Sequence, residues 1–391
     1  MKACIRVDSS KSIGTGHVMR SLTLAREIRR NGGDVVFICR YLPGNLIAKI
    51  LENNFSVVTL HDNPNKVDIL ASEDFLINDW QLDARQTIDA LIDSNADILI
   101  VDHYYIDYRW ERLIRSAVDK IMVIDDLANR LHDCDILLDQ NFIADYQLRY
   151  DVLVPQDTLK LLGPAYCMLQ NEYAALRTKI QTRASLPKRV LVYFGGFDPH
   201  ELTIKVLKAA LDLVGNNLHF DVVVGSDYKN NMALKTMLTR HSNIEIYENL
   251  PTLANLMVVA DFSIGASGVT TWERCCLGLP SLIITFAQNQ IKIAEMIDRS
   301  GLGIWVGNSD SICVDDINSA IFQIMNKNNL HEMSRKCMKI VDGLGVKRVY
   351  AEMLNAIGTK TIVRQVTDKD KKLLLEWAND PITRLSAFNH A

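Results

Sequence analysis

The fold is decided by residues 3–38, ACIRVDSSKSIGTGHVMRSLTLAREIRRNGGDVVFI. The first five of them are β-rich, and after a glycine-bearing loop apolar residues recur at helical spacing from Val18 to Ile28. Asn31-Gly32-Gly33 ends that helix, and residues 35–38 are the next strand. The stretch therefore predicts a strand–helix–strand unit.

Apolar runs of strand length recur along the whole chain. Helical stretches separate them, which is typical of parallel strands covered on both faces. The runs are residues 98–101, 121–124, 190–194, 220–224 and 282–284. We expect an α/β protein with a Rossmann-like domain at 1–165, a polar linker at 166–187 and a second Rossmann-like domain at 188–357. Ligands of such folds bind at the carboxyl ends of the strands, so we expect the site in an interdomain cleft.

The composition excludes several classes of protein. Of 391 residues, 48% are hydrophobic and 23% are charged, unlike a disordered, collagen-like or disulfide-scaffold chain. The net charge of −4 gives no bulk basic field, so no nucleic acid is an expected partner. The eight cysteines have no zinc-type spacing, so we expect buried thiols and no metal. With no signal-peptide pattern and no run of about 20 apolar residues, we expect a cytoplasmic protein without membrane insertion.

A phosphate-binding turn is predicted at Gly14-Thr15-Gly16-His17, where backbone N–H groups and the helix dipole favour an anion. Met19 stands where a dinucleotide fingerprint has its third glycine, and no P-loop occurs, so we expect no NAD, no ATP-type cradle and no cofactor. His17, with Arg6 and Asp8 nearby, is a candidate base or hydrogen-bond donor. A histidine that caps its own helix is the alternative.

Acids end two further strands of the first half. Asp102 and Tyr104 close one strand, and Asp125-Asp126 close the next, at the edge where such folds place functional groups. Adjacent strand residues point to opposite faces, so a pair of neighbouring acids seldom reaches one site. We therefore rank Asp102 and Tyr104 above Asp125.

The second half contains two more turns suited to phosphate. Gly195-Gly196-Phe197-Asp198 lies between a strand and a helix, and Gly265 to Glu273 comprises a strand end, a small-residue loop and a helix. Small residues let the backbone approach a diphosphate, and Glu273 has the reach to accept both hydroxyls of a ribose. Gln288-Asn289 offers amide hydrogen bonds to a sugar or base. The alternatives are an ordinary turn at Gly195-Gly196, a solvated helix charge at Glu273 and a plain polar loop at Gln288-Asn289.

Together these residues resemble a known family. Residues 6–10, 13–17, 102–104, 125–128, 194–199 and 265–273 are similar to the UDP-sugar hydrolases of pseudaminic acid biosynthesis, the PseG family, and the match spans about residues 1–357. The resemblance implies a GT-B fold related to MurG. It also implies hydrolysis of UDP-2,4-diacetamido-2,4,6-trideoxy-β-L-altropyranose to UDP and the free sugar, without a required metal.

The resemblance implies residue roles as well. His17 would orient or deprotonate the attacking water, with Tyr104 and Asp8 around the sugar. Glu273 would hold the ribose, and the diphosphate would lie on Gly195, Gly196, Ser267 and Gly268. The other residues expected around the substrate are Arg6, Gly14, Gly16, Arg20, Asp198, Gly265, Thr270, Gln288 and Asn289. Phe197 replaces the serine that is common in the family, so a hydroxyl contact to phosphate is lost there.

Residues 361–391 resemble the first strand and helix of a GNAT N-acetyltransferase. Val363 to Val366 would be the strand, and a capped helix from Asp368 to Asp380 would follow. The segment lacks the glycine-rich turn for the acetyl-CoA pyrophosphate, so the resemblance implies a fused acetyltransferase domain that continues beyond residue 391. A C-terminal helix folded back on the protein is the alternative.

Three other functions fit the same pattern. The strongest rival is a MurG-like glycosyltransferase that moves the sugar of a UDP-sugar donor to an acceptor. A hydrolysing UDP-N-acetylglucosamine 2-epimerase is a weaker rival, because the sequence pattern of those epimerases is not seen in this chain. A non-catalytic nucleotide-sugar binding protein is the alternative from outside the enzymes.

Overall fold

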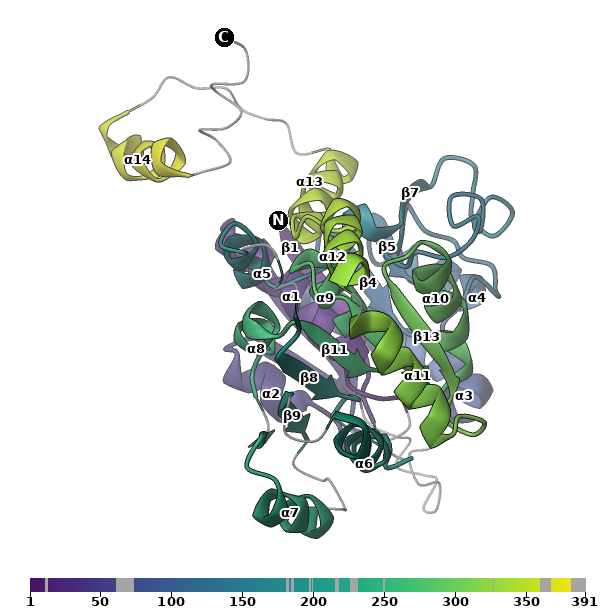
Figure 1. Cartoon of the computed structure of the whole chain (residues 1–391). Coiled ribbons are helices and arrows are strands. Elements are labelled where there is room, and N and C mark those ends of the chain that lie inside the picture. Colours follow the sequence, from purple (N-terminus) through teal and green to yellow (C-terminus); the bar gives the residue numbers. More distant parts are fainter. Residues whose placement is uncertain are drawn as a thin grey trace. The chain divides into compact units, whose positions relative to one another are not determined.

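The computed structural model describes residues 1–10, 13–60, 74–180, 183, 186–196, 198, 200–214, 218–225, 231–248, 250–325, 327–358 and 367–380. The chain divides into two compact units, Met1–Ile357 and Gly358–Ala391. The first unit contains two sheets of parallel strands separated by helices (Figure 1). The predicted α/β class is therefore correct.

The first sheet has seven strands in the order β3-β2-β1-β4-β5-β6-β7, and every neighbouring pair is parallel. The strands are β1 (Lys2–Val7), β2 (Asp34–Arg40), β3 (Ser56–Leu60), β4 (Ile98–Asp102), β5 (Lys120–Ile124), β6 (Ile136–Asp139) and β7 (Leu159–Leu162). The helices of this part are α1 (Gly16–Arg30), α2 (Ile47–Glu52), α3 (Asp74–Ser94), α4 (Tyr108–Ile114), the 3-10 turn η1 (Pro164–Tyr166) and α5 (Asn171–Arg177).

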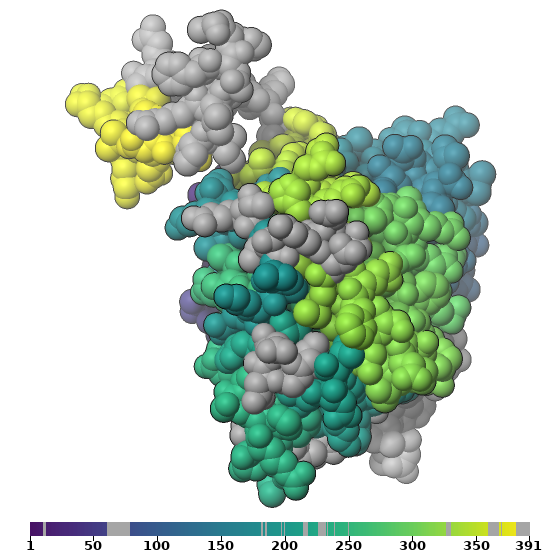
Figure 2. Space-filling view, in the orientation of Figure 1, coloured from purple at the N-terminus to yellow at the C-terminus, as the bar shows by residue number. Residues whose placement is uncertain are grey.

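The second sheet has six strands in the order β10-β9-β8-β11-β12-β13, again all parallel. The strands are β8 (Arg189–Tyr193), β9 (His219–Val224), β10 (Ile244–Glu248), β11 (Phe262–Gly265), β12 (Ser281–Thr285) and β13 (Gly303–Asn308). Its helices are α6 (Leu202–Val214), α7 (Asn231–Arg240), α8 (Ala254–Val259), α9 (Val269–Cys276), α10 (Gln288–Arg299), α11 (Val314–Met325), α12 (Lys327–Ile340) and α13 (Gly345–Ile357). On the face that Figure 2 shows, these teal and green elements form most of the surface of Met1–Ile357.

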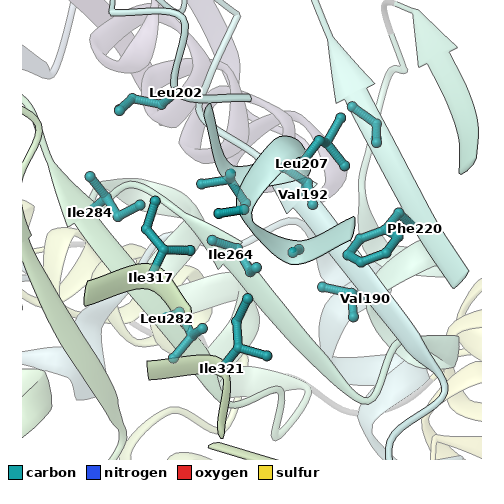
Figure 3. Packing of buried hydrophobic residues seen from close by; sticks show 14 of the residues in the cluster. Val190, Val192, Leu202, Leu207, Phe220, Ile264, Leu282, Ile284, Ile317 and Ile321 are labelled. Carbon is teal, nitrogen blue, oxygen red and sulfur yellow. The ribbon is translucent and has the colours of Figure 1, made fainter. Parts of the chain in front are cut away.

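The strands are apolar along their length because both faces of each sheet are covered. In the second sheet, Val190, Phe220 and Ile264 come from three neighbouring strands and lie in one buried cluster. Figure 3 shows Leu207 of α6 and Ile317 of α11 packing against these side chains. Burying apolar surface at roughly 25 cal/mol per Å² makes such a cluster a main source of the stability of this half.

In each sheet, the direction in which successive strands are added reverses beside the first strand of that half. The reversal lies between β1 and β4 in the first sheet and between β8 and β11 in the second. Loops at the carboxyl ends of two such strands diverge to opposite faces of a sheet, which leaves room for a ligand. The turns predicted to bind phosphate follow β1, β8 and β11, so all three lie at a reversal point.

Helix α13 belongs to the core of the first sheet, although it lies near the end of the unit. Val346, Val349 and Met353 join the buried cluster that contains Val18 and Leu22 of α1. The domain limits 1–165 and 188–357 stay a prediction.

The eight cysteines are free thiols, and all but Cys313 are buried, as expected. Among the helices that the structure describes, none combines the length and the apolar character needed to cross a membrane.

The second unit contains a 3-10 turn at Asp368–Asp370 and helix α14 (Lys371–Asn379), so the helix predicted there is confirmed. Residues 363–366, the predicted strand, lie outside the described residues. The resemblance of this segment to an acetyltransferase remains a prediction.

Candidate active site

The first group of predicted site residues meets at the carboxyl edge of the first sheet. Asp102 is the last residue of β4, Asp126 follows β5, and α1 places His17 and Arg20 one turn apart. Gly14 has a φ of +83°, which favours glycine, and a Cβ on Gly16 would meet nothing within 4 Å. The turn before α1 therefore leaves open space at the start of the helix.

His17 and Asp102 form a close pair, with 2.5 Å between Nδ1 and Oδ1. Arg20 Nη2 lies 3.1 Å from the same Nδ1, but it donates to Asp102 Oδ1 at 2.6 Å. Because the carboxylate oxygen is an acceptor only and is the nearest partner of Nδ1, this nitrogen holds the proton and donates it to Asp102. The other ring nitrogen, Nε2, then has a free lone pair in the neutral imidazole.

Arg20 is a buried cation held between two carboxylates. Its Nε and Nη2 donate to Asp102 at 2.6 Å each, and its Nη1 donates to Asp126 at 2.7 Å. Burial opposes the ionised form of Asp102, but the attraction of Arg20 and His17 outweighs it and holds the pKa of Asp102 well below its usual range. Asp102 is therefore an ionised acceptor at neutral pH.

Tyr104 completes this group. Its hydroxyl donates to Asp126 Oδ2 at 3.1 Å, and its ring stands edge-on to the imidazole of His17 with 4.4 Å between centroids. Burial, and then the charge of Asp126, raise the pKa of Tyr104 far above its usual value, so the phenol stays neutral. The sequence pointed to His17, Arg20 and Tyr104, and the structure brings them together.

Arg6 and Asp8 lie in a neighbouring buried network rather than at an open surface. Arg6 donates to both oxygens of Asp8 at 2.6 and 2.8 Å, and also to Asp83. Asp8 Oδ1 accepts from the backbone of Arg40, and His103 Nε2 lies 3.2 Å from Oδ2. Both side chains have no exposed surface. The contacts of Arg6 and Asp8 with substrate stay a prediction, and their observed partners are protein groups.

Asp139 is a functional candidate that sequence reasoning missed. This last residue of β6 accepts from Arg149 and, at 3.1 Å, from the hydroxyl of Tyr150. Burial, and then the nearby charge of Asp126, raise the pKa of Asp139 to about 7. Its position at the end of a buried strand was the available sequence signal, but no recognisable turn follows Asp139.

The second group lies on the second sheet. Gly195 has a φ of +106°, and a Cβ on Gly196 would meet nothing within 4 Å, so the turn after β8 is open. Asp198 accepts from the backbone N–H groups of Leu202 and Thr203 at 3.0 and 2.9 Å and thus caps the start of α6. A direct contact of Asp198 with substrate stays a prediction. Phe197 lies outside the described residues.

The turn after β11 is shaped by small residues. A Cβ on Gly265 would lie 2.2 Å from the carbonyl oxygen of Tyr193, so only glycine allows β11 to approach β8 here. Gly268 precedes the first residue of α9 and has open space around it. Ser267 donates to the carbonyl of Gln290 at 2.8 Å, and Thr270 is partly exposed in the first turn of the helix. The backbone N–H groups at the start of α9 suit an anion.

Glu273 lies one turn into α9 and is partly exposed. Burial raises the pKa of Glu273 to about 7, so the carboxyl group is poised near neutrality. Gln288 and Asn289 are exposed in the first turn of α10.

A possible metal-ligand group lies away from both turns. Among the described residues, His219, Asp221 and Glu245 place ligand atoms within 4.8 Å of one another, at the amino ends of β9 and β10. Arg189 already donates to both oxygens of Asp221, at 2.5 and 2.8 Å. A cation there would compete with the guanidinium, so the group is better explained as an ion-pair cluster.

Relatives in sequence support the comparison with sugar-nucleotide enzymes. The chain is 27% identical over 393 residues to the uncharacterized protein MJ1062 of Methanocaldococcus jannaschii, covering 98% of this chain and 73% of that protein. It is 23% identical to the spore coat polysaccharide biosynthesis protein SpsG of Bacillus subtilis, over 90% and 97% of the two chains. It is 27% identical to the UDP-2,4-diacetamido-2,4,6-trideoxy-β-L-altropyranose hydrolase of Campylobacter jejuni, over 77% and 97%. No family model matches the chain.

Solved structures agree on the fold. MurG of Acinetobacter baumannii superposes with a TM-score of 0.63 at 13% identity, covering 90% of this chain and 99% of that one. The calicheamicin glycosyltransferase CalG4 gives 0.59 at 15% identity, covering 92% and 99%. These likenesses confirm the predicted architecture: the chain has the GT-B fold, with two Rossmann-like sheets.

Proposed function

We propose that this chain is a nucleotide-sugar hydrolase that cleaves a UDP-linked 2,4-diacetamido-2,4,6-trideoxyhexose to UDP and the free sugar in pseudaminic (nonulosonic) acid biosynthesis. The observation on which this rests most is the His17–Asp102 pair, because Asp102 accepts the proton of Nδ1 and the basic lone pair then lies on Nε2. The Campylobacter jejuni relative, a hydrolase of this type, and the polysaccharide biosynthesis protein of Bacillus subtilis support the substrate class.

The proposed reaction needs a base, an anion site and a ribose site. Water loses a proton to Nε2 of His17 and attacks C1 of the sugar, while the bond from C1 to the diphosphate oxygen breaks and UDP leaves. Asp102 stabilises the imidazolium that forms, and Tyr104 holds the ring edge. The open turns after β8 and β11 bind the departing diphosphate through backbone N–H groups, and Glu273 accepts the ribose hydroxyls.

The decisive experiment is UDP release from a panel of UDP-diacetamido sugars by the purified chain, without any acceptor. Turnover in oxygen-18 water is expected to place the label in the sugar. Label in the UDP would mean attack at phosphorus and would contradict the proposed step. His17→Ala is expected to abolish turnover while UDP affinity changes less than about twofold.

A glycosyltransferase is the second candidate, favoured by the shared fold with MurG and CalG4. It predicts no UDP release in water alone and release only when a sugar or lipid acceptor is added. The same assay therefore separates the two functions.

A further inference from the structure

A buried arginine lies against the turn that follows β11. Arg274, in the second turn of α9, is 2% exposed, and its Nη2 donates to the carbonyl oxygen of Ala266 at 2.7 Å. A Cβ on Gly265 would lie 2.9 Å from its Nη1, so the guanidinium packs directly against the end of β11. The side chain of Arg274 therefore points back along α9, toward the turn that is proposed to bind the diphosphate.

The same guanidinium is bound to the first turn of α9. Its Nη2 also donates to Thr271 Oγ1 at 3.1 Å, and that oxygen accepts the backbone N–H of Gly268 at 3.1 Å. Because the N–H of Gly268 is used in this way, the donors that the helix start offers to an anion are the N–H groups of Val269 and Thr270, which have no acceptor within α9. Arg274 thus holds the segment on which the proposed diphosphate site depends.

Arg274 has no counter-ion among the residues that the structure describes. Its hydrogen-bond partners there are neutral oxygens, its Nε is buried without a partner, and no carboxylate oxygen of those residues lies within 4.0 Å of its nitrogens. Arg6 and Arg20, which are buried to a similar extent, are each held by two carboxylates. Burial lowers the pKa of Arg274 to about 10, so the group stays charged at neutral pH.

The position of this charge is unfavourable in the free protein. The start of a helix already carries the positive end of the helix dipole, and a buried cation without a counter-ion is costly. By contrast, Arg177 donates to the carbonyl of Cys276 at 2.8 Å, at the end of α9 where a cation is favourable. The charge of Arg274 is therefore suited to a bound anion, which would compensate both the guanidinium and the helix dipole.

We propose that Arg274 is a positioning residue of the diphosphate site, whose buried guanidinium holds the turn after β11 in place and supplies the positive charge that a bound diphosphate compensates. This inference rests on the proposed function, since it assigns the diphosphate to that turn. Arg274 acts through the turn and not by contact with the ligand, so its effect appears in the affinity for the phosphates and not in the affinity for the uridine part.

The test is calorimetric binding of UDP and of uridine to the full chain and to its variants. Arg274→Gln removes the charge but keeps an amide that can donate, so it should bind UDP about tenfold more weakly or worse, and uridine within about twofold of the wild type. Arg274→Lys keeps the charge and loses the guanidinium fork, so its UDP affinity should fall no more than about threefold. Arg177→Gln is the matched control at the other end of the same helix and should leave both affinities within about twofold.

Arg274→Met is a second neutral variant, expected to fold because an apolar chain of similar length replaces a buried charge, and it should lose UDP affinity as Arg274→Gln does. Losses that are equal for UDP and uridine, or a loss in Arg274→Lys as large as in the neutral variants, would overturn the inference. A wild type that does not bind UDP would refute the proposed function and this inference with it. A wild type that binds UDP no better than the neutral variants do refutes only the role of Arg274.

Discussion

At the residue scale, the proton on Nδ1 of His17 is the feature on which the proposed chemistry depends. Asp102 accepts a hydrogen bond from Nδ1, and Arg20 keeps Asp102 ionised. A histidine with this partner differs from one that only caps its helix, because its second nitrogen is left as a base. The capping alternative for His17 is disfavoured by this contact.

The first prediction concerns Asp102→Asn. An amide can donate to Nδ1 and reverse the tautomer, so kcat for UDP release should fall by about 100-fold or more, with the Kd for UDP within about twofold. Steady-state kinetics and calorimetry measure the two quantities. Asp107→Asn, at the start of α4, is the control and should turn over normally. An unchanged kcat in Asp102→Asn would contradict the assigned tautomer.

The second prediction concerns the effect of Glu273 ionisation on the free energy of unfolding. Burial raises its pKa from 4.5 to about 7, so between these pH values the folded state keeps a proton that the unfolded state has released. The contribution of Glu273 to the free energy of unfolding therefore falls as the pH rises through this window. Glu273→Gln, which cannot ionise, should be more stable than the wild type at pH 8 by up to about 3 kcal/mol, and by much less at pH 5.

Urea unfolding at both pH values measures this difference. Glu332→Gln on the exposed face of α12 is the control and should show no such pH dependence, because its partner Lys336 is also on the surface. An equal effect of Glu273→Gln on the free energy of unfolding at pH 5 and pH 8 would mean that ionisation of this carboxyl group does not contribute to the pH dependence of stability.

At the scale of elements, sequence periodicity located the central strands and their turns but not the edges of the sheets. Strands such as β4, β5 and β8 are continuous apolar runs because helices cover both faces. β6 and β7 are four residues each, so their apolar runs are too short for a period to be recognised. Long-range pairs were also beyond reach: Arg20 and Asp126 are 106 positions apart in the chain.

An arginine side chain of the linker binds the second half at the carboxyl ends of two helices. Arg183 donates to the carbonyls of Val258 at 3.0 Å and Leu277 at 2.6 Å, and also to those of Ala260 and Gly278. These carbonyls lie at the carboxyl ends of α8 and α9, where a positive charge is favourable. Burial lowers the pKa of Arg183 to about 10, so it stays charged at neutral pH.

The third prediction is that Arg183→Met lowers the free energy of unfolding by about 3 kcal/mol, since four carbonyls, three of them in buried hydrogen bonds, lose their donor. Urea unfolding gives the value. Arg112→Met is the control, because Arg112 is 68% exposed and its pair with Asp133 should contribute less than about 1 kcal/mol. A loss below about 1 kcal/mol for Arg183→Met would show that water replaces the guanidinium.

At the scale of the whole molecule, the two units differ in how much they bury. The described residues of Met1–Ile357 form four buried apolar clusters, whereas α14 of the second unit has no buried residue. Leu375 and Trp377 are 64% and 56% exposed. The stability of the first unit is therefore expected to be independent of the second.

The fourth prediction tests this independence by deletion of residues 358–391. The melting temperature of the shortened chain should stay within about 2 °C of the full chain, since α14, the helix that the structure describes in this segment, has no buried residue. Its Kd for UDP should stay within about twofold. A fall in melting temperature of more than about 5 °C would show that the tail supports the first unit.

The return of α13 to the first sheet has a practical consequence for recombination between relatives. Val346 and Val349 pack in the core of the first sheet, and Arg348 donates to the carbonyl of Ala165 at 2.7 Å. In chain order, the segment that forms the second sheet is therefore inserted between two parts of the first half. A chimera that exchanges sugar-nucleotide specificity thus needs two crossovers, one before α5 and one before α13, and a single junction at the linker would leave the recipient sheet without its last helix.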